Sequence, residues 1–274
     1  MNLYKSLIFI LYLGIFLGSG FRTPAQSRDS ITLYGTLDTV QVIRQRIQHA
    51  NEANAGARVT HISPAILQAN KTRSLAELLT DHTSIYIKSL GTGALSTASF
   101  RGTSASQTRV NWNGINITPP LSGTFDFSQI PVFFTDNINL YYGSSHVKNG
   151  TGAIGGSVNL FTDTDWNRGV NGRVLAEYGS YNTYTVGGQA NISGNKSASK
   201  TRLYYQHSDN DYTYLNKVLT NIPFREKRQD AAYSQFGIMQ EGYFRVSPYT
   251  RLTAVAWYQK NHRNLPQPLG VVNR

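Results

Sequence analysis

Oxygen-bearing side chains gather in one long polar stretch, and they are the residues of this chain best suited to hold a metal ion. Asp209, Asn210 and Asp211 are consecutive, and Asp230 follows in the same stretch. Calcium prefers carboxylate and amide oxygens as ligands. The sequence therefore gives a candidate calcium site, with a solvated acidic loop as the alternative. The chain contains no Cys, which removes a thiolate zinc site, a thiol nucleophile and a disulfide framework.

The other groups that carry chemistry in enzymes are present but are not spaced for it. The six His residues show no metal-ligand spacing. The glycine cluster from Gly150 to Gly156 lacks the Lys-Ser/Thr pair of a phosphate loop and leads into a strand pattern. We therefore expect no catalytic site. We also expect no nucleic-acid binding, because the net charge of +11 is spread along the chain.

The N-terminus predicts the compartment. Lys5 is followed by an uncharged, mostly apolar run over residues 6–21, and Ala25-Gln26-Ser27 fits a signal cleavage site. The run is shorter than the roughly 20 residues that a spanning helix needs. We predict a cleaved signal peptide over residues 1–27, with a short anchor helix as the alternative. No later segment is apolar for long enough to span as a helix, so membrane insertion would have to use strands.

Two regions with different patterns follow the signal. Residues 46–164 predict a compact α+β domain, with a helix over residues 75–82 capped by Ser74 and a hairpin turn at Asn113-Gly114. Strands are expected at residues 85–87, 108–112, 115–117, 138–142 and 157–161.

Residues 165–274 instead alternate apolar and polar side chains over about five segments of roughly ten residues, the pattern of antiparallel transmembrane β-barrel strands. Short connections at residues 194–200 and 247–250 contrast with a long one at 207–232, as periplasmic turns and extracellular loops would. The 17 Tyr residues suit the interfacial girdles of such barrels. A soluble β-sandwich is the alternative, although its strands are usually about five or six residues long. Five strands are too few to close a barrel, so we expect an incomplete one.

Several motifs in order carry a family resemblance. Asp38, Thr39, Val40, Gln41 and Val42 look like an energy-coupling box. The segments that match the remaining signature are Phe100–Ser106 with Asn113-Gly114, Ser128–Pro131, Tyr142-Gly143 and Gly152–Asn159. The chain thus resembles the TonB-dependent outer-membrane receptors, and within them most closely the receptors for vitamin B12. The resemblance divides the chain into a signal (1–27), a tether with the coupling box (28–45), a plug domain (46–164) and the first barrel strands (165–274).

The resemblance implies a plug inside a monomeric barrel of 22 strands in the cell outer membrane, importing a large scarce nutrient without catalysis. The TonB complex of the inner membrane would be the partner, adding the coupling box as a strand to its own sheet; an ordinary first plug strand is the alternative for that segment. Cobalamin or another corrinoid is the favoured cargo, and a ferric siderophore or heme is the alternative. A passive outer-membrane barrel and a soluble β-sandwich binding protein remain further alternatives. Calcium is the one candidate cofactor. A surface lipoprotein that covers the receptor as a lid is a further candidate partner.

The same resemblance assigns site residues. It places two loops at the outer face of the plug as ligand-binding candidates: Gly91, Thr92, Gly93, Ala94, Leu95 and Ser96 in one, and Pro119, Pro120, Leu121, Ser122 and Gly123 in the other. It also suggests a plug–barrel latch between Arg101 and either Glu177 or Glu241, both of which the alternation turns toward the lumen. The chain departs from the family at Asn113, where Asp is usual, and near Asn139 and Tyr142, where Glu and Arg are usual.

Overall fold

The computed structural model describes residues 58–143, 152–217 and 223–266. All described elements belong to one compact unit, Ile47–Arg274. No helix among the described residues is long and apolar enough to cross a membrane. The signal peptide and the coupling box lie outside the described residues, so both stay predictions.

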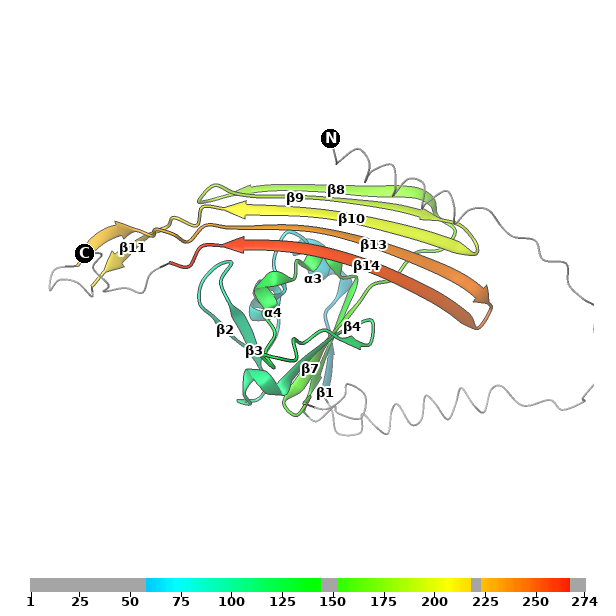
Figure 1. Ribbon diagram of the computed structural model, residues 1–274, viewed down its shortest axis with the longest axis horizontal. Coiled ribbons are helices and arrows are strands. Elements are labelled where there is room, and N and C mark those ends of the chain that lie inside the picture. Colours follow the sequence, from blue (N-terminus) through cyan, green and yellow to red (C-terminus); the bar gives the residue numbers. More distant parts are fainter. Residues whose placement is uncertain (1–57, 144–151, 218–222, 267–274) are drawn as a thin grey trace, which may run out of the picture. The chain divides into compact units, whose positions relative to one another are not determined.

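The plug contains a five-stranded mixed sheet with two short helices and a separate hairpin (Figure 1). The strand order is β1-β6-β7-β4-β5, in which β4 and β7 are parallel and the other pairs are antiparallel. The elements are β1 (Arg58–His61), α3 (Pro64–Ala69), α4 (Leu75–His82), β2 (Tyr86–Ser89), β3 (Ser96–Ser99), β4 (Thr108–Trp112), β5 (Ile115–Asn116), β6 (Asn137–Tyr142) and β7 (Gly156–Phe161), with 3₁₀ turns at Ala105–Gln107, Phe127–Gln129 and Val132–Phe134.

Local chemistry explains where the plug elements begin and turn. Ser74 and Glu77 form a capping box at the start of α4: the Glu77 N–H donates to Ser74 Oγ, and the Ser74 N–H donates to Glu77 Oε2 at 2.8 Å. Asn113 and Gly114 both have positive φ, which the tight β4–β5 hairpin requires. The helix and this hairpin were both predicted from the sequence, and the structure confirms them.

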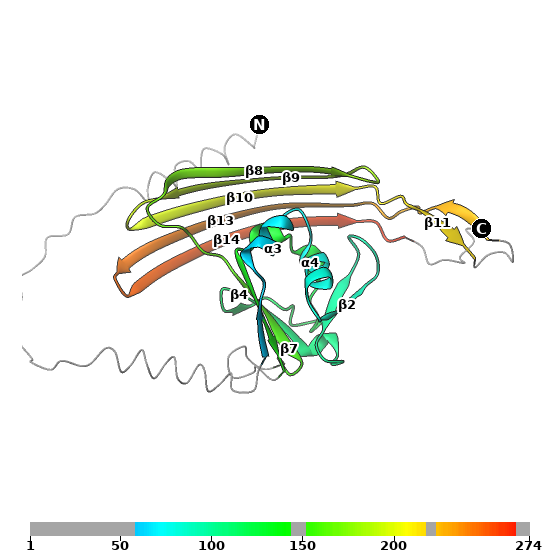
Figure 2. The same ribbon diagram turned by 180° about the vertical axis from the view of Figure 1, so that it is seen from behind.

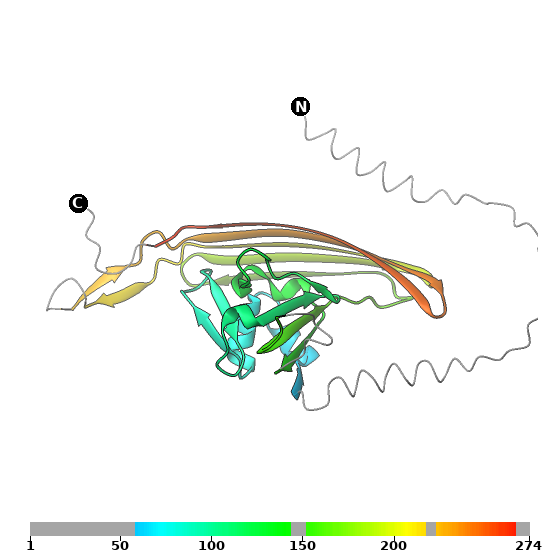
Figure 3. The ribbon, with the colours of Figure 1, turned by 60° about the horizontal axis from the view of Figure 1, so that its bottom comes forward.

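The second sheet consists of five long antiparallel strands in the order β14-β13-β10-β9-β8. They are β8 (Gly169–Gly179), β9 (Thr183–Ser193), β10 (Ser197–Ser208), β13 (Tyr233–Ser247) and β14 (Thr250–Arg263), each between 11 and 15 residues long. Figures 1 and 2 show these strands running side by side, and Figure 3 shows that the sheet is curved. The long connection carries its own hairpin, β11 (Thr213–Asn216) with β12 (Phe224–Lys227), at one end of the sheet.

The two faces of this sheet differ, as the alternation predicts. Along β10 and β13 the inward residues are buried against the plug, and their neighbours are exposed. The exposed outer face is apolar and includes Val170, Val174, Val186, Ile192, Leu203, Phe236, Ile238, Phe244, Val246 and Leu252. This pattern is typical of strands whose outer side meets lipid. It does not fit a β-sandwich, in which a second sheet would cover that face.

The plug and the strands share one hydrophobic core. Tyr204 of β10 and Met239 of β13 join a buried cluster whose other members come from the plug, among them Phe100, Phe133 and Phe134. Gly237 of β13 makes the close approach possible, because a Cβ atom there would lie 2.7 Å from the ring of Phe134. The missing side chain on the strand therefore lets an aromatic ring of the plug rest on its backbone.

Candidate functional site

Five charged residues form a largely buried polar contact between plug and strands, named here the junction cluster: Lys71, Asp136, Lys200, Arg202 and Glu241. Lys71 and Asp136 come from the plug, Lys200 and Arg202 from β10, and Glu241 from β13. The Arg202 guanidinium lies 2.5 Å from Asp136 Oδ2 and 3.2 Å from Glu241 Oε2. Lys200 Nζ lies 3.0 Å from the same Asp136 oxygen.

Backbone groups complete the junction cluster. Arg202 also donates to the carbonyl of Phe133 at 2.9 Å, and Lys71 Nζ donates to the carbonyl of Thr135 at 2.5 Å. The N–H of Asp163, in the segment that leads from the plug to β8, donates to Asp136 Oδ2 at 3.0 Å. Asp136 therefore binds a barrel strand and the connecting segment with one carboxylate.

Burial and neighbouring charges act in opposite directions on the pKa values of Asp136 and Lys71. Burial alone would raise the pKa of Asp136, but the charges of Arg202 and Lys200 hold it below its ordinary value of 3.8. Burial lowers the pKa of Lys71 to about 8, and the negative charge of Asp136 only partly opposes this. Asp136 is therefore ionised at neutral pH, and Lys71 loses its proton more readily than an ordinary lysine.

The structure does not pair Arg101 with Glu177 or Glu241, so the predicted latch between them is wrong. Arg101 is exposed in a turn of the plug, and it forms no ion pair with any described residue. Glu177 and Glu241 do face inward as predicted, but Glu241 pairs with Arg202 and accepts the Tyr243 hydroxyl at 2.6 Å. The physical reason is proximity, because Arg202 and Glu241 share the inner face of paired strands.

A second set of contacts, named here the outer clamp, binds the plug turn around Phe127–Gln129. Gln235 of β13 donates to the carbonyl of Ser128 at 2.8 Å, and Gln259 of β14 donates to the carbonyl of Gln129. Arg263 lies 2.9 Å from Asp126 Oδ2, and Asp126 Oδ1 accepts the N–H of Ser96 at 3.0 Å. The clamp thus links two barrel strands to the end of the first predicted ligand loop.

The structure separates the two predicted ligand loops. Gly91–Ser96 forms the tip of the β2–β3 hairpin and contacts the strands: Asn210 donates to the carbonyl of Thr92 at 3.2 Å, and the ring of Tyr233 packs on Gly93. Gly93 has a φ of +68°, and a Cβ atom there would lie 2.3 Å from that ring. Pro119–Gly123 forms an exposed turn, with Leu121 fully open to solvent, and lines neither of the two cavities described next.

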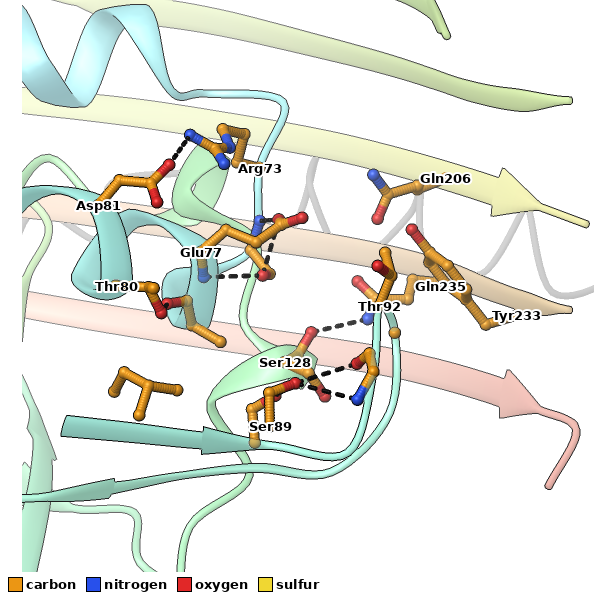
Figure 4. A pocket seen from close by; sticks show the side chains of 16 residues that line it. Arg73, Glu77, Thr80, Asp81, Ser89, Thr92, Ser128, Gln206, Tyr233 and Gln235 are labelled. Atoms are coloured by element: carbon orange, nitrogen blue, oxygen red, sulfur yellow. Dashed lines mark hydrogen bonds and ion pairs between the residues drawn. The ribbon is translucent and has the colours of Figure 1, made fainter. Parts of the chain in front are cut away.

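Two adjoining cavities lie between the hairpin tip, α4 and the strands. One has a volume of about 340 Å³ and is lined by α4, the hairpin and inward residues of β10 and β13 (Figure 4). The other, of about 560 Å³, shares Arg73, Glu77 and Tyr233 with it and extends to Tyr181 and Tyr212 near the long connection. Sequence reasoning missed the α4 side of these cavities, because no motif marks a helix face that lines a hollow.

The structure gives three of the four predicted calcium ligands separate partners. Asp209 accepts from Asn182 and His207, each at 3.1 Å, and Asp211 pairs with Lys227. Asn210 turns its amide nitrogen, which is a donor and not a metal ligand, toward the Thr92 carbonyl. No group of three or more His, Asp or Glu side chains is placed for a metal ion within residues 58–143, 152–217 and 223–266. Calcium binding, for which Asp230 was also a candidate, stays a prediction.

A mixed plug packed against the inner face of long antiparallel strands, whose outer face is apolar, is the arrangement of a plugged outer-membrane barrel. Comparison with known proteins shows which class of plugged barrel this arrangement resembles. Residues 51–157 match the family model described as TonB-dependent Receptor Plug Domain. Residues 51–157 are therefore similar to the plug domain of TonB-dependent receptors.

Two curated relatives show which receptors the chain is similar to in sequence. The chain is 32% identical over 135 residues to the vitamin B12 transporter BtuB of Photobacterium profundum, which is 49% of this chain and 22% of that protein. It is also 32% identical over 126 residues to BtuB of Vibrio cholerae, covering 46% of this chain and 20% of that protein. The chain thus spans about a fifth of the length of these relatives.

Solved structures agree on the fold. The siderophore receptor PiuA from Acinetobacter baumannii matches with a TM-score of 0.55 at 21% identity, over 74% of this chain and 26% of that one. The pyoverdine receptor FpvA from Pseudomonas aeruginosa matches with a TM-score of 0.57 at 16% identity, over 74% of this chain and 27% of that one. At such identities the likeness concerns the architecture alone.

Proposed function

We propose that the chain is the plug-bearing part of a TonB-dependent receptor that imports a corrinoid, with cobalamin as the cargo to test first. The observation that carries the proposal is the 32% identity to vitamin B12 transporters, against an architecture shared with receptors for other cargo. The small, hydroxylated tip Gly91–Ser96 supports it, because such residues let backbone groups approach a large ligand closely. No feature of the described residues separately supports a ferric siderophore or heme as the cargo.

Energy would come from the TonB complex through the predicted coupling box. Strand addition needs the backbone N–H groups of residues 38–42, so proline at Val40 should remove coupling without touching the ligand loops. Val40→Ile is the matched control, because isoleucine keeps the backbone donor and the β-propensity.

The test uses the receptor encoded at its natural locus, with cobalamin uptake and cobalamin binding measured separately. We expect binding in all three proteins and uptake in the wild type and Val40→Ile. Val40→Pro should bind normally but fail to import. A folded receptor that does not bind cobalamin contradicts the cargo, and uptake by Val40→Pro contradicts the coupling role of this segment.

A further inference from the structure

The turn between β4 and β5 contains a dipeptide that can modify itself chemically. Asn113 is followed by Gly114, whose missing Cβ atom leaves its backbone nitrogen unshielded beside the asparagine side chain. The Gly114 nitrogen can lose its proton to water and form a bond to Asn113 Cγ, which expels ammonia and closes a succinimide ring. Water then opens the ring to aspartate or isoaspartate. The reaction needs water as its sole co-reactant.

Water reaches this turn in the structure. Gly114 and the following Ile115 are exposed, and Asn113 is half-buried. The turn is also tight, because Asn113 and Gly114 have φ angles of +49° and +84°. Burial therefore does not protect the dipeptide from water, and any protection depends on how the Asn113 side chain is held.

Three hydrogen bonds anchor Asn113 to the end of β7. The backbone N–H of Asn113 donates to the carbonyl of Leu160 at 2.9 Å. Its side-chain nitrogen donates to Thr162 Oγ1, and its side-chain oxygen accepts the N–H of Thr162, each at 2.9 Å. The side-chain amide is thus fixed at both ends by one residue. An attack on Cγ requires the side chain to rotate toward the Gly114 nitrogen, which breaks both side-chain bonds.

Thr162 is in turn held between the plug and the strands. It is 6% exposed, and its Oγ1 lies 3.4 Å from the hydroxyl of Tyr243 on β13. The same hydroxyl donates to Glu241 Oε1 at 2.6 Å, so this contact continues into the junction cluster. The residue that fixes the Asn113 amide is therefore positioned by the seated plug.

We propose that Asn113-Gly114 is a site of spontaneous deamidation, which the contact with Thr162 suppresses and which becomes reactive when the β4–β5 turn opens. Two neutral hydrogen bonds hold the amide, so the folded plug should slow the reaction about five- to 150-fold relative to the unfolded chain. The aspartate product still accepts the Thr162 N–H. The isoaspartate product adds a carbon to the backbone and is incompatible with the two-residue hairpin. The proposal does not depend on the identity of the cargo.

Peptide mapping by mass spectrometry follows the conversion, because the acid is heavier than the amide. The full-length receptor is incubated at mildly alkaline pH, folded in one sample and unfolded in guanidinium in the other. Asn171-Gly172 of β8 is the internal comparison, since it is the same dipeptide and Asn171 Oδ1 is bonded to Asn191 at 2.8 Å, away from Thr162. We expect similar rates at both sites in the unfolded sample and the stated slowing at Asn113 in the folded one. Equal rates at Asn113 in the two samples overturn the proposal.

Two variants of Thr162 test the contact itself. Thr162→Val removes the hydroxyl that accepts from Asn113 but keeps the backbone N–H and the shape of the side chain. It should speed the conversion at Asn113 about two- to twelvefold in the folded receptor, the equivalent of one neutral hydrogen bond, and leave Asn171 unchanged. Thr162→Ser keeps the hydroxyl and should keep the wild-type rate. Equal rates in the two variants, or an acceleration that Asn171 shares, refute the role of Thr162.

Discussion

Replacing Asp136 by Asn should loosen the plug from the strands at the junction cluster. The substitution keeps the size of the side chain but removes the charge that faces Arg202 at 2.5 Å and Lys200 at 3.0 Å. Arg202 has no exposed side-chain surface, whereas the Asp136 side chain is 25% exposed. The variant therefore leaves two barrel cations near a neutral amide, and water reaches that amide only from one side.

The expected loss of free energy holding the plug to the strands follows from these contacts. Removing one partner of a fully buried ion pair costs about 3–5 kcal/mol. Two features reduce this figure here, because Asp136 is partly exposed and Arg202 keeps Glu241 at 3.2 Å. We therefore expect a loss of about 2–3 kcal/mol, which corresponds to an increase of about 30- to 150-fold in the equilibrium constant of local opening and hence in the observed exchange rate.

Hydrogen–deuterium exchange reads this opening out by segment. Peptides that cover β6 and residues 157–165 should exchange faster by that factor in Asp136→Asn, while peptides from β13 and β14 should change less. Asp165→Asn is the control, because its pair with Arg168 is about two-thirds exposed and worth at most about 1 kcal/mol. If Asp136→Asn exchanges within threefold of the wild type, or no faster than Asp165→Asn, the energetic role assigned to Asp136 is refuted.

Three further predictions concern neighbouring contacts. The Lys71 pKa of about 8 lies below its ordinary 10.5, so between these values the unfolded chain binds one more proton than the folded one. The free energy of unfolding should therefore rise with pH over this range, and denaturant titrations of Lys71→Met should lack that part of the rise. Gly237→Ala should cost about 1–3 kcal/mol in the same assay because its Cβ would press on Phe134, whereas Gly242→Ala, with its nearest atom at 3.5 Å, should cost less. Asp126→Asn keeps an acceptor for Ser96 but loses the charge facing Arg263, so exchange should quicken in peptides spanning residues 91–99.

The sequence predicts the long elements well because their signals are local. A helix cap at Ser74, an Asn-Gly turn and two-residue alternation each depend on neighbours in the chain, and the structure confirms all three. It missed β1, α3 and β3, which have four to six residues each. Such short segments carry too few residues for a period to show, so tertiary pairing decides their structure.

The site was less predictable, because partners meet across the fold. Alternation turned Glu241 inward correctly, but only the strand register places it beside Arg202. Asn113 shows the same limit: where the family usually has Asp, its amide donates to Thr162 Oγ1 and its oxygen accepts the Thr162 N–H, each at 2.9 Å. The exchange of Asp for Asn therefore suits a contact that needs both a donor and an acceptor.

The two sets of plug contacts differ in strength, and the difference implies an order of release. The outer clamp consists of two neutral amide contacts and one partly exposed ion pair, Arg263 with Asp126. Neutral hydrogen bonds are worth about 0.5–1.5 kcal/mol each, and water replaces them readily once the clamp opens. The junction cluster instead joins Asp136 to two buried cations of β10, and separating them leaves Lys200 without its carboxylate and Arg202 with Glu241 alone. Because Asp126 also binds Ser96, a ligand that moves the hairpin tip acts first on the weaker set. We therefore expect the plug to loosen at the turn around Ser128 while Asp136 still holds the segment that leads into β8.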